Sequence, residues 1–229
     1  MLHGFLPSIL GGAVVTVTVA LSSLLIAVLL GLLGAAMKLS KSRTAKALAT
    51  VYTTVIRGVP DLVLMLVIFY GGQLEINELA PKFGYNDYVD INPFIAGVWT
   101  IGFIFGAYLT ETFRGALLAI PAGQREAAIA YGMSSRQVFM RITFPQMVRF
   151  ALPGFSNNWL VLVKSTALVS VIGLSDMMNR AGMAAGATHE PFTFYMTAAA
   201  IYLVITTISV LTLKALERRY SMGIKVASL

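Results

Sequence analysis

Long apolar stretches, separated by short polar segments, dominate the pattern of this chain. No Lys, Arg, Asp or Glu occurs before Lys38, and none occurs from 191 to 213. Each stretch is longer than the roughly 20 apolar residues that a helix needs to cross the hydrocarbon core of a bilayer. The pattern predicts five membrane-spanning helices in one domain, residues 1–229. We expect the spans at about 9–37, 48–72, 94–113, 150–174 and 192–213.

The composition agrees with an all-α integral membrane protein. Of the residues, 57% are hydrophobic and 12% charged, whereas a soluble domain is nearer half apolar and about a quarter charged. The first residues carry no Lys or Arg, and the apolar run behind them is too long for a secretory signal. With no cysteine and two histidines, disulfides are excluded and a metal site is not expected.

The basic residues are distributed unevenly between the two sets of predicted loops. Fourteen of the 17 Lys and Arg residues fall in one set: Lys38, Lys41, Arg43, Lys46, Arg57, Arg114, Arg125, Arg136, Arg141, Arg149, Lys214, Arg218, Arg219 and Lys225. The opposite loops hold only Lys82 and Arg180 and collect acidic residues instead. By the positive-inside rule, the N-terminus lies outside and the C-terminus lies in the cytoplasm. The same rule accounts for the net charge of +7 without a nucleic-acid partner.

The longest basic loop contains a segment, about 120–145, that predicts two short helices. Residues 124–131 favour a helix that ends at Gly132, a natural C-cap. Ser134 and Gln137 have capping-box spacing, and the second helix is expected to stop before Pro145. Such a pair forms a compact knob that could contact a partner. The residues alone equally allow an amphipathic loop that rests on lipid headgroups.

Six residues of this knob resemble the EAA signature of ABC importer permeases. They are Glu126, Ala127, Ala128, Gly132, Ile142 and Pro145, with the spacing EAA-x3-G-x9-I-x2-P. The resemblance implies the transmembrane domain of a type I ABC importer, in which this knob is the coupling helix that docks into a cleft of the ATPase. Small alanines would permit close approach, and Glu126 would offer a charge to an Arg or Lys of the ATPase.

The resemblance implies a transport subunit that is not itself an enzyme. The chain has no phosphate-binding pattern of the form G-x4-G-K followed by Ser or Thr. No cofactor is therefore expected on this chain, and ATP and Mg are expected on a separate ATPase. The implied partners are two copies of that ATPase, a second homologous permease chain, an extracytoplasmic amino-acid-binding protein and the lipid of a bacterial inner membrane, which the chain crosses several times.

Further segments resemble the Q-type permease subunits of polar amino-acid importers. The segments are 57–63, 106–111, 120–124, 157–159, 164–168 and 217–221. The relatives in question import histidine, lysine, arginine and ornithine, so the resemblance implies a basic amino acid as cargo. Opine permeases are close neighbours of this group. Opines or other polar amino acids therefore stay open as the alternative cargo.

The substrate pathway is expected at interruptions and polar residues within the spans. Gly58 and Pro60 interrupt predicted span two, which exposes backbone groups to a cavity, makes a simple kink, or marks the entry of the helix into the membrane. Arg57 and Asp61 are four apart on a helix and could pair. Tyr108 belongs to the pathway candidates through the resemblance of segment 106–111.

Lys164 lies between apolar flanks in predicted span four, where a lone ammonium costs at least about 2.5–3.5 kcal/mol. It must therefore face a cavity, a carboxylate or other protein. It either binds the α-carboxylate of the substrate or forms a buried ion pair at a helix or subunit contact.

The resemblance also bears on which chain holds the substrate. In relatives that work as homodimers, two acids of span four lie seven residues apart on one face. Aligned on Lys164, this chain has Asn158 and Ser165 there, and Ile104 and Phe105 replace a polar pair of span three. A cationic ligand would stay unpaired against that wall, which is costly. We therefore expect a heterodimer whose other permease supplies the acids, unless specificity resides wholly in the binding protein.

Two other classes fit the residues less well. An intramembrane hydrolase needs a nucleophile and base that face each other, but His3 and His189 are expected near the outer face of the membrane and no Gly-x-Ser-x-Gly turn occurs. An ion channel or ion-coupled carrier favours acidic relays inside its spans, where only Asp61 and Glu111 qualify.

Overall fold

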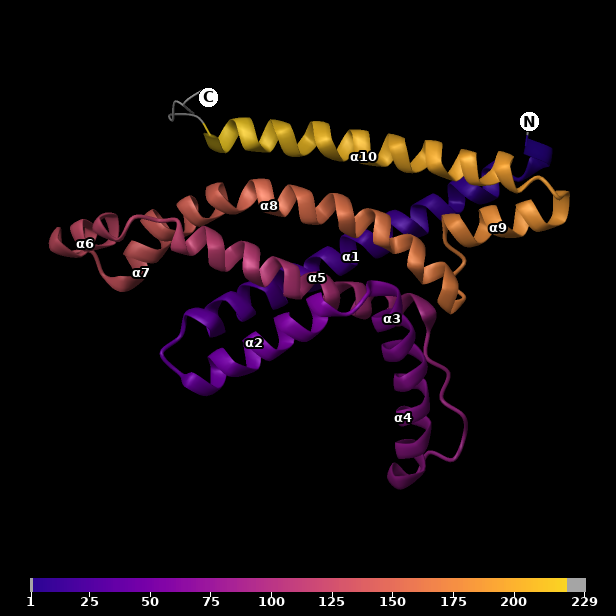
Figure 1. The fold of residues 1–229 in the computed structure, drawn as a ribbon, viewed down its shortest axis with the longest axis horizontal. Coiled ribbons are helices and arrows are strands. Elements are labelled where there is room, and N and C mark those ends of the chain that lie inside the picture. Colours follow the sequence, from indigo (N-terminus) through magenta and orange to yellow (C-terminus); the bar gives the residue numbers. More distant parts are fainter. Residues whose placement is uncertain (1, 222–229) are drawn as a thin grey trace.

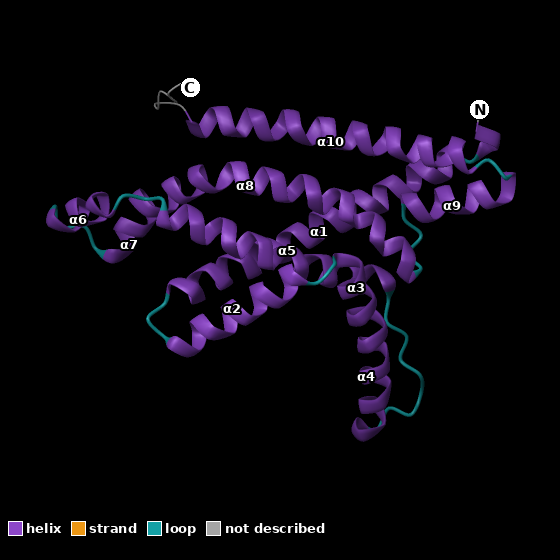
Figure 2. Ribbon diagram, in the orientation of Figure 1, coloured by secondary structure: helices purple, strands orange, loops and turns teal. Residues whose placement is uncertain are grey.

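Four long helices form an elongated bundle, and one helical arm projects from it (Figure 1). The computed structural model describes residues 2–221, so Lys225 lies outside the described part. The long helices are α1 (Leu6–Leu39), α5 (Pro93–Leu118), α8 (Phe144–Ser165) and α10 (Pro191–Ser221). The shorter ones are α2 (Arg43–Gly58), α3 (Asp61–Leu66), α4 (Gly72–Leu79), α6 (Ala122–Ala130), α7 (Ser135–Val138) and α9 (Met177–Thr188). Within residues 2–221 the fold has no strand (Figure 2).

Five helical segments are long and apolar enough to cross a membrane, which confirms the predicted number. They are Leu6–Leu39, Asp61–Phe83, Pro93–Leu118, Ser135–Ile172 and Pro191–Tyr220. Two of them are composite. A π-helical turn at Val67–Gly71 and a 3-10 turn at Ala80–Phe83 belong to the second, and a π-helical turn at Phe139–Thr143 and a 3-10 turn at Thr166–Ile172 belong to the fourth.

The second span differs from the range of 48–72 predicted from the sequence. Helix α2 ends at Gly58, Val59 and Pro60 are extended, and the spanning segment starts at Asp61. A proline disfavours helical backbone in the residue before it and cannot donate a hydrogen bond. Val59 has accordingly left the helical region, at φ −111° and ψ 138°. The chain is therefore broken at this point, and α2 is a separate amphipathic helix packed on α1 and α5.

Helices α1 and α5 cross at very close range, and glycines on both of them permit the approach. A β-carbon on Gly31 or Gly34 of α1 would lie 2.7 Å from Leu109 Cβ or 2.3 Å from Thr110 Oγ1 of α5. On α5, a β-carbon on Gly102 would meet Ile26 of α1 at 2.7 Å. Small residues let membrane helices gain van der Waals contact where no hydrophobic driving force exists between them. The reciprocal seam makes these two helices the centre of the main core.

Helix α9 and the first half of α10 close a second, smaller core against the start of α1. Gly12 of α1 lies under the N-terminus of α9, since a β-carbon there would meet the Asp176 carbonyl oxygen at 2.8 Å. Thr16 is fully buried and accepts a hydrogen bond from Met177 N at 3.2 Å. Asp176 is 1% exposed and caps α9 by accepting from Asn179 N at 2.9 Å. These contacts fix α9 to the end of the bundle where the N-terminus lies (Figure 1).

The knob predicted at about 120–145 lies at the opposite end of the bundle (Figure 1). The predicted capping box is confirmed, because Ser134 Oγ accepts from Gln137 N and Gln137 Oε1 accepts from Ser134 N at 2.9 Å. The expected helix stop before Pro145 is wrong. A π-helical turn at Phe139–Thr143 leads directly into α8, in which Pro145 occupies the first turn. Helical backbone runs without a break from α7 into α8, and the proline is tolerated because the π-helical turn before it, where Phe144 N bonds Phe139 O, has already displaced the regular hydrogen-bond pattern.

Candidate coupling knob and substrate pathway

The turn between α6 and α7 is a Schellman motif. Met133 N bonds Ala128 O at 3.1 Å and Gly132 N bonds Ile129 O at 2.9 Å. Gly132 has φ +79°, and no atom lies within 4 Å of where its β-carbon would be. Glycine is therefore favoured at this position by its backbone conformation, not by crowding.

The knob presents only part of its EAA signature at the surface. Glu126, Ala127 and Pro145 are exposed, Ile142 is half-buried and Ala128 is 6% exposed. Ala128 was expected to permit the approach of a partner, but it packs inside the knob, and its carbonyl closes the Schellman motif. The surface available to a partner is therefore the face of α6 with Glu126 and Ala127.

A side-chain contact holds this face in a fixed relation to the bundle. Gln146 of α8 donates to Gln124 Oε1 of α6 at 2.5 Å and to Ile142 O at 3.0 Å. Ala119–Pro121 are the only residues between α5 and α6. The knob is thus connected to α5 through the chain and to α8 through an amide bridge.

The break between α2 and α3 brings several of the predicted pathway residues together. The guanidinium of Arg57 lies 5.5 Å from the ring centroid of Tyr108, a cation–π distance. Gly58 is exposed, and its β-carbon would meet no atom within 4 Å. The expected pairing of Arg57 with Asp61 is wrong among the described residues, whose ion pairs lie elsewhere. The break at Pro60 has removed the helical spacing that such a pair requires.

Asn158 joins the same region through a residue that the sequence did not single out. Its side-chain amide donates to Thr112 Oγ1 at 2.9 Å, and Thr112 Oγ1 donates to Tyr108 O at 3.2 Å. Thr112 lies one helical turn after Tyr108, so its spacing on α5 was the signal that could have identified it. A polar path therefore runs from Arg57 on α2 across α5 to Asn158 on α8.

Lys164 and Ser165 lie apart from this path, nearly two turns further along α8. Lys164 is exposed, and no ion pair of the described residues includes it. It belongs to a stripe at helical spacing on α8 whose exposed members are Phe150, Pro153, Asn157, Val161 and Lys164. An ammonium group on the open face of a spanning helix is unfavourable against lipid. This stripe is therefore better placed against protein or water than against acyl chains.

The pair Ile104 and Phe105 does not line any pathway. These side chains are 1% and 2% exposed and belong to the main core. These side chains therefore serve packing within this chain, and the expectation that they form an apolar pocket wall is wrong.

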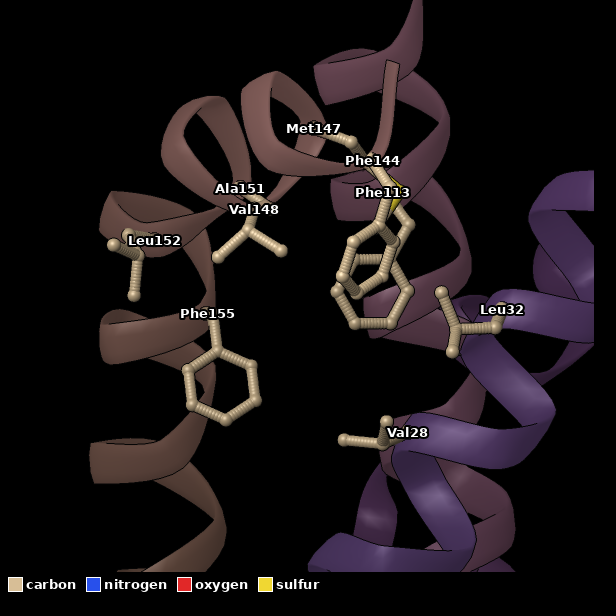
Figure 3. Close-up of a pocket in the computed structure, with 9 residues that line it drawn as sticks. All are labelled: Val28, Leu32, Phe113, Phe144, Met147, Val148, Ala151, Leu152 and Phe155. Carbon is tan, nitrogen blue, oxygen red and sulfur yellow. The ribbon is translucent and has the colours of Figure 1, made fainter. Parts of the chain in front are cut away.

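The hollow in Figure 3 is also unsuited to an amino acid. It measures about 240 Å³ and lies between α1, α5 and α8. Its lining is wholly apolar: Val28, Leu32, Phe113, Phe144, Met147, Val148, Ala151, Leu152 and Phe155. A charged amino acid would lose its hydration there without a compensating hydrogen bond. The polar path at the helix break, not this hollow, is the candidate site.

A second polar cluster, which the sequence did not predict, joins α1, α2 and α5. Lys38 of α1 contacts Glu111 of α5 and donates to Thr53 Oγ1 of α2 at 2.6 Å. Arg114 donates to Glu111 Oε2 at 3.0 Å. Two features of the sequence could have indicated this cluster. Lys38 is the first charged residue of the chain, and Glu111 is an acid inside a predicted span.

Five helical segments that are long and apolar enough to cross a membrane, with a helical knob at one end of the bundle, fit a membrane transport permease. Comparison with known proteins identifies its group. The family of binding-protein-dependent transport system inner membrane components matches residues 27–222, and the chain belongs to that family. It is therefore a multi-pass protein of the bacterial inner membrane.

Individual relatives are similar over all or nearly all of the chain. It is 54% identical to the histidine/lysine/arginine/ornithine transport system permease protein HisQ of Salmonella typhimurium, over 100% of both chains. It is 42% identical to the octopine transport system permease protein OccQ of Rhizobium radiobacter, over 92% of this chain and 89% of the relative. A solved structure described as an amino acid ABC transporter with histidines has a chain with a TM-score of 0.78 and 34% identity, covering 93% of this chain and 94% of that one.

Proposed function

We propose that this chain is the permease subunit of an ATP-driven importer for basic amino acids: histidine, lysine, arginine and ornithine. The similarity over full length to HisQ supports this cargo. The similarity to an octopine permease supports opines as the second candidate. Binding measurements on the cognate extracytoplasmic binding protein, with histidine, arginine and octopine in parallel, distinguish the two. Preferential binding of octopine would contradict the basic amino-acid assignment.

The proposed partners are those of a binding-protein-dependent importer. Two copies of an ABC ATPase bind ATP and Mg and carry out hydrolysis, and this chain is not an enzyme. A second permease pairs with it in the membrane, and an extracytoplasmic amino-acid-binding protein delivers the substrate. The basic residues of the α1–α2 turn and of the knob support a cytoplasmic location for that end, with the N-terminus outside.

Coupling is assigned to the EAA residues Glu126, Ala127, Ala128, Gly132, Ile142 and Pro145. The observation that carries this assignment is the exposed face of α6 at the end of the bundle, with Glu126 free to meet a basic group. ATP binding closes the ATPase dimer and moves the knobs of the two permeases together. The spans then rotate and open a midplane cavity outward, and hydrolysis resets them.

The substrate pathway is assigned to the helix break and the polar path beside it, with Gly58, Pro60, Tyr108 and Asn158, and to Lys164 and Ser165 further along α8. The open space at Gly58, the cation–π pair of Arg57 with Tyr108 and the exposed ammonium of Lys164 support this assignment. Broken helices near the midplane commonly build transporter sites, because their free backbone groups face a polar cavity.

Charge reversal on the knob tests the function. In a reconstituted complex, Glu126→Lys should leave the amount of inserted chain unchanged but abolish uptake and the hydrolysis that the binding protein stimulates. Gly132→Val should act in the same direction, because a branched residue at φ +79° distorts the Schellman turn.

The matched control for Glu126→Lys is Lys41→Glu, another charge reversal at an exposed site of the same end, on the α1–α2 turn. It should retain transport. Normal uptake by both knob variants would show that the knob is a passive surface helix.

A further inference from the structure

The cluster of Lys38, Thr53, Glu111 and Arg114 lies where three helices meet. Lys38 and Glu111 are largely enclosed, with side chains 12% and 22% exposed. Lys38 contacts acceptors on two different helices, Thr53 of α2 and Glu111 of α5. The cluster therefore connects α1, α2 and α5 at a single level.

This level is close to the origin of the knob. Glu111 lies in the second half of α5, and α5 continues through three connecting residues, Ala119–Pro121, into α6. The glycine seam beside the cluster packs α1 closely against α5, because Thr110, the residue before Glu111, lies directly against Gly34. A displacement of α6 that is passed to α5 at this level must therefore be passed to α1 as well.

Helix α2 buries Ala49, Thr53 and Ile56 against the bundle, and three polar contacts to α1 and α5 add to that packing. Lys38 of α1 donates to Thr53, the Tyr52 hydroxyl donates to Phe103 O of α5 at 2.6 Å, and Arg57 lies over the ring of Tyr108 of α5. These contacts place α2 along α5 from Thr53 to the break at Gly58 and Pro60. Of these three contacts, the one at Lys38 lies nearest the knob. It is also the one that belongs to a cluster with an ion pair between helices, that of Lys38 on α1 with Glu111 on α5.

We infer that Lys38 and Glu111 are positioning residues, which make α1, α2 and α5 move as one body with the coupling knob. Glu111 holds the Lys38 ammonium in place, and Lys38 passes a displacement of α6 to α2 through its hydrogen bond to Thr53, and hence to the helix break beside Tyr108. Without this pair, α5 still moves with the ATPase while α2 follows incompletely, so hydrolysis and opening of the pathway separate. This inference rests on the proposed function of the knob and names residues that lie outside the EAA signature.

The test uses the complete complex, reconstituted with its partner permease, ATPase and binding protein. Lys38→Met and Glu111→Gln keep side-chain length and remove one charge each. At equal amounts of assembled complex, uptake per ATP hydrolysed should fall about tenfold, within the range typical of coupling between two sites. Hydrolysis should continue and should no longer respond to the binding protein.

Two further variants separate positioning from simple stability. The exchange Lys38→Glu with Glu111→Lys re-forms the pair in reverse. It should recover much of the coupling ratio, which is the uptake per ATP hydrolysed. Arg114→Gln removes a charge that bonds Glu111 within the same helix, and should leave the ratio near that of the unmodified complex. A purely structural role would change the amount of assembled complex without changing transport per ATP.

The outcomes distinguish this inference from the proposed function. Loss of stimulated hydrolysis in Glu126→Lys together with a normal coupling ratio in Glu111→Gln would overturn the inference and leave the function intact. An unmodified complex whose hydrolysis never responds to the binding protein would overturn both. A coupling ratio that stays low in the exchanged pair and falls equally in Arg114→Gln would also contradict the inference.

Discussion

Asp176 caps α9 with one carboxylate oxygen, while the other oxygen is buried without a hydrogen-bond partner among residues 2–221. Burial raises the pKa of this carboxyl above its ordinary value of 3.8, and the hydrogen bond from Asn179 N and the charge of Arg180 only partly oppose that effect. The Arg180 guanidinium is directed to backbone carbonyls of Ser175 and Ser8. Folding therefore disfavours the ionised form of Asp176 relative to the unfolded chain.

The pH dependence of Asp176→Asn follows from this shift. The folded state holds a proton on Asp176 to higher pH than the unfolded state does. The contribution of this group to the free energy of unfolding is therefore complete below pH 3.8, the ordinary pKa of the group, and is lost as pH rises through its pKa in the folded protein. Asparagine can still cap α9 and cannot ionise. We expect Asp176→Asn to raise the unfolding temperature of the purified complex at neutral pH, with a gain that shrinks toward acidic pH.

A cap variant without a titratable group is the control for that experiment. Ser42 caps α2 by accepting from Ala45 N, and Ser42→Ala should lower stability by about 1 kcal/mol at every pH. A difference between Asp176→Asn and the unmodified protein that does not vary with pH would contradict the assignment of a raised pKa.

At the scale of the element, the α1–α5 seam gives the clearest expectation. Gly34→Val would place a branched side chain where Thr110 Oγ1 is 2.3 Å from the first added carbon. Overpacking of this kind typically costs about 1–3 kcal/mol. Thermal unfolding of the purified complex should therefore shift to lower temperature.

Gly115→Ala is the matched substitution for the seam. It lies on α5, and a β-carbon there would meet no atom within 4 Å. Alanine favours helix over glycine by about 1 kcal/mol, so this variant should be neutral or slightly more stable. Equal unfolding temperatures for Gly34→Val and Gly115→Ala would show that the two helices separate easily.

The elements also show where sequence patterns were sufficient. The capping box at Ser134 and the C-cap at Gly132 depend only on neighbouring residues, and these predictions are confirmed. Pro60 and Pro145 had opposite outcomes. One broke the chain into two helices, and the other was absorbed in the first turn of α8 behind a π-helical turn. Whether a proline interrupts a helix depends on which backbone groups the surrounding turns can still satisfy.

At the scale of the whole molecule, the arm formed by α3, α4 and the turns around them projects from the bundle (Figure 1). Its apolar side chains Val67, Leu74 and Phe83 are 62%, 73% and 78% exposed. Its outer half is steadied internally, since Asn77 exchanges two hydrogen bonds with the backbone of Val89. An ordered arm with an apolar surface fits the proposal that a second permease packs beside this chain.

The proposed heterodimer leads to an asymmetry between the two permeases. Asn158→Ala and Ser165→Ala should retain substantial uptake, because neither side chain can neutralise a cationic substrate. Removal of the acids at the corresponding positions of the partner should abolish uptake, since a buried cation without a counter-charge is costly. Uptake of labelled arginine into proteoliposomes measures both. A functional importer assembled from this permease alone, with its ATPase and binding protein, would contradict the heterodimer.

The sequence by itself determined the features that depend on solvent and on neighbouring residues. Apolar stretches such as residues 1–37 need a bilayer wherever they lie, so the number of spans followed directly. The EAA spacing likewise identified the family without coordinates. Tertiary structure decided which residues meet across the bundle. The Lys38 and Glu111 contact, the burial of Ile104 and Phe105, and the link from Asn158 to Thr112 depend on how closely α1, α5 and α8 approach, for which the seam glycines are decisive between α1 and α5. The burial of Ala128 depends on how α6 and α7 fold against each other.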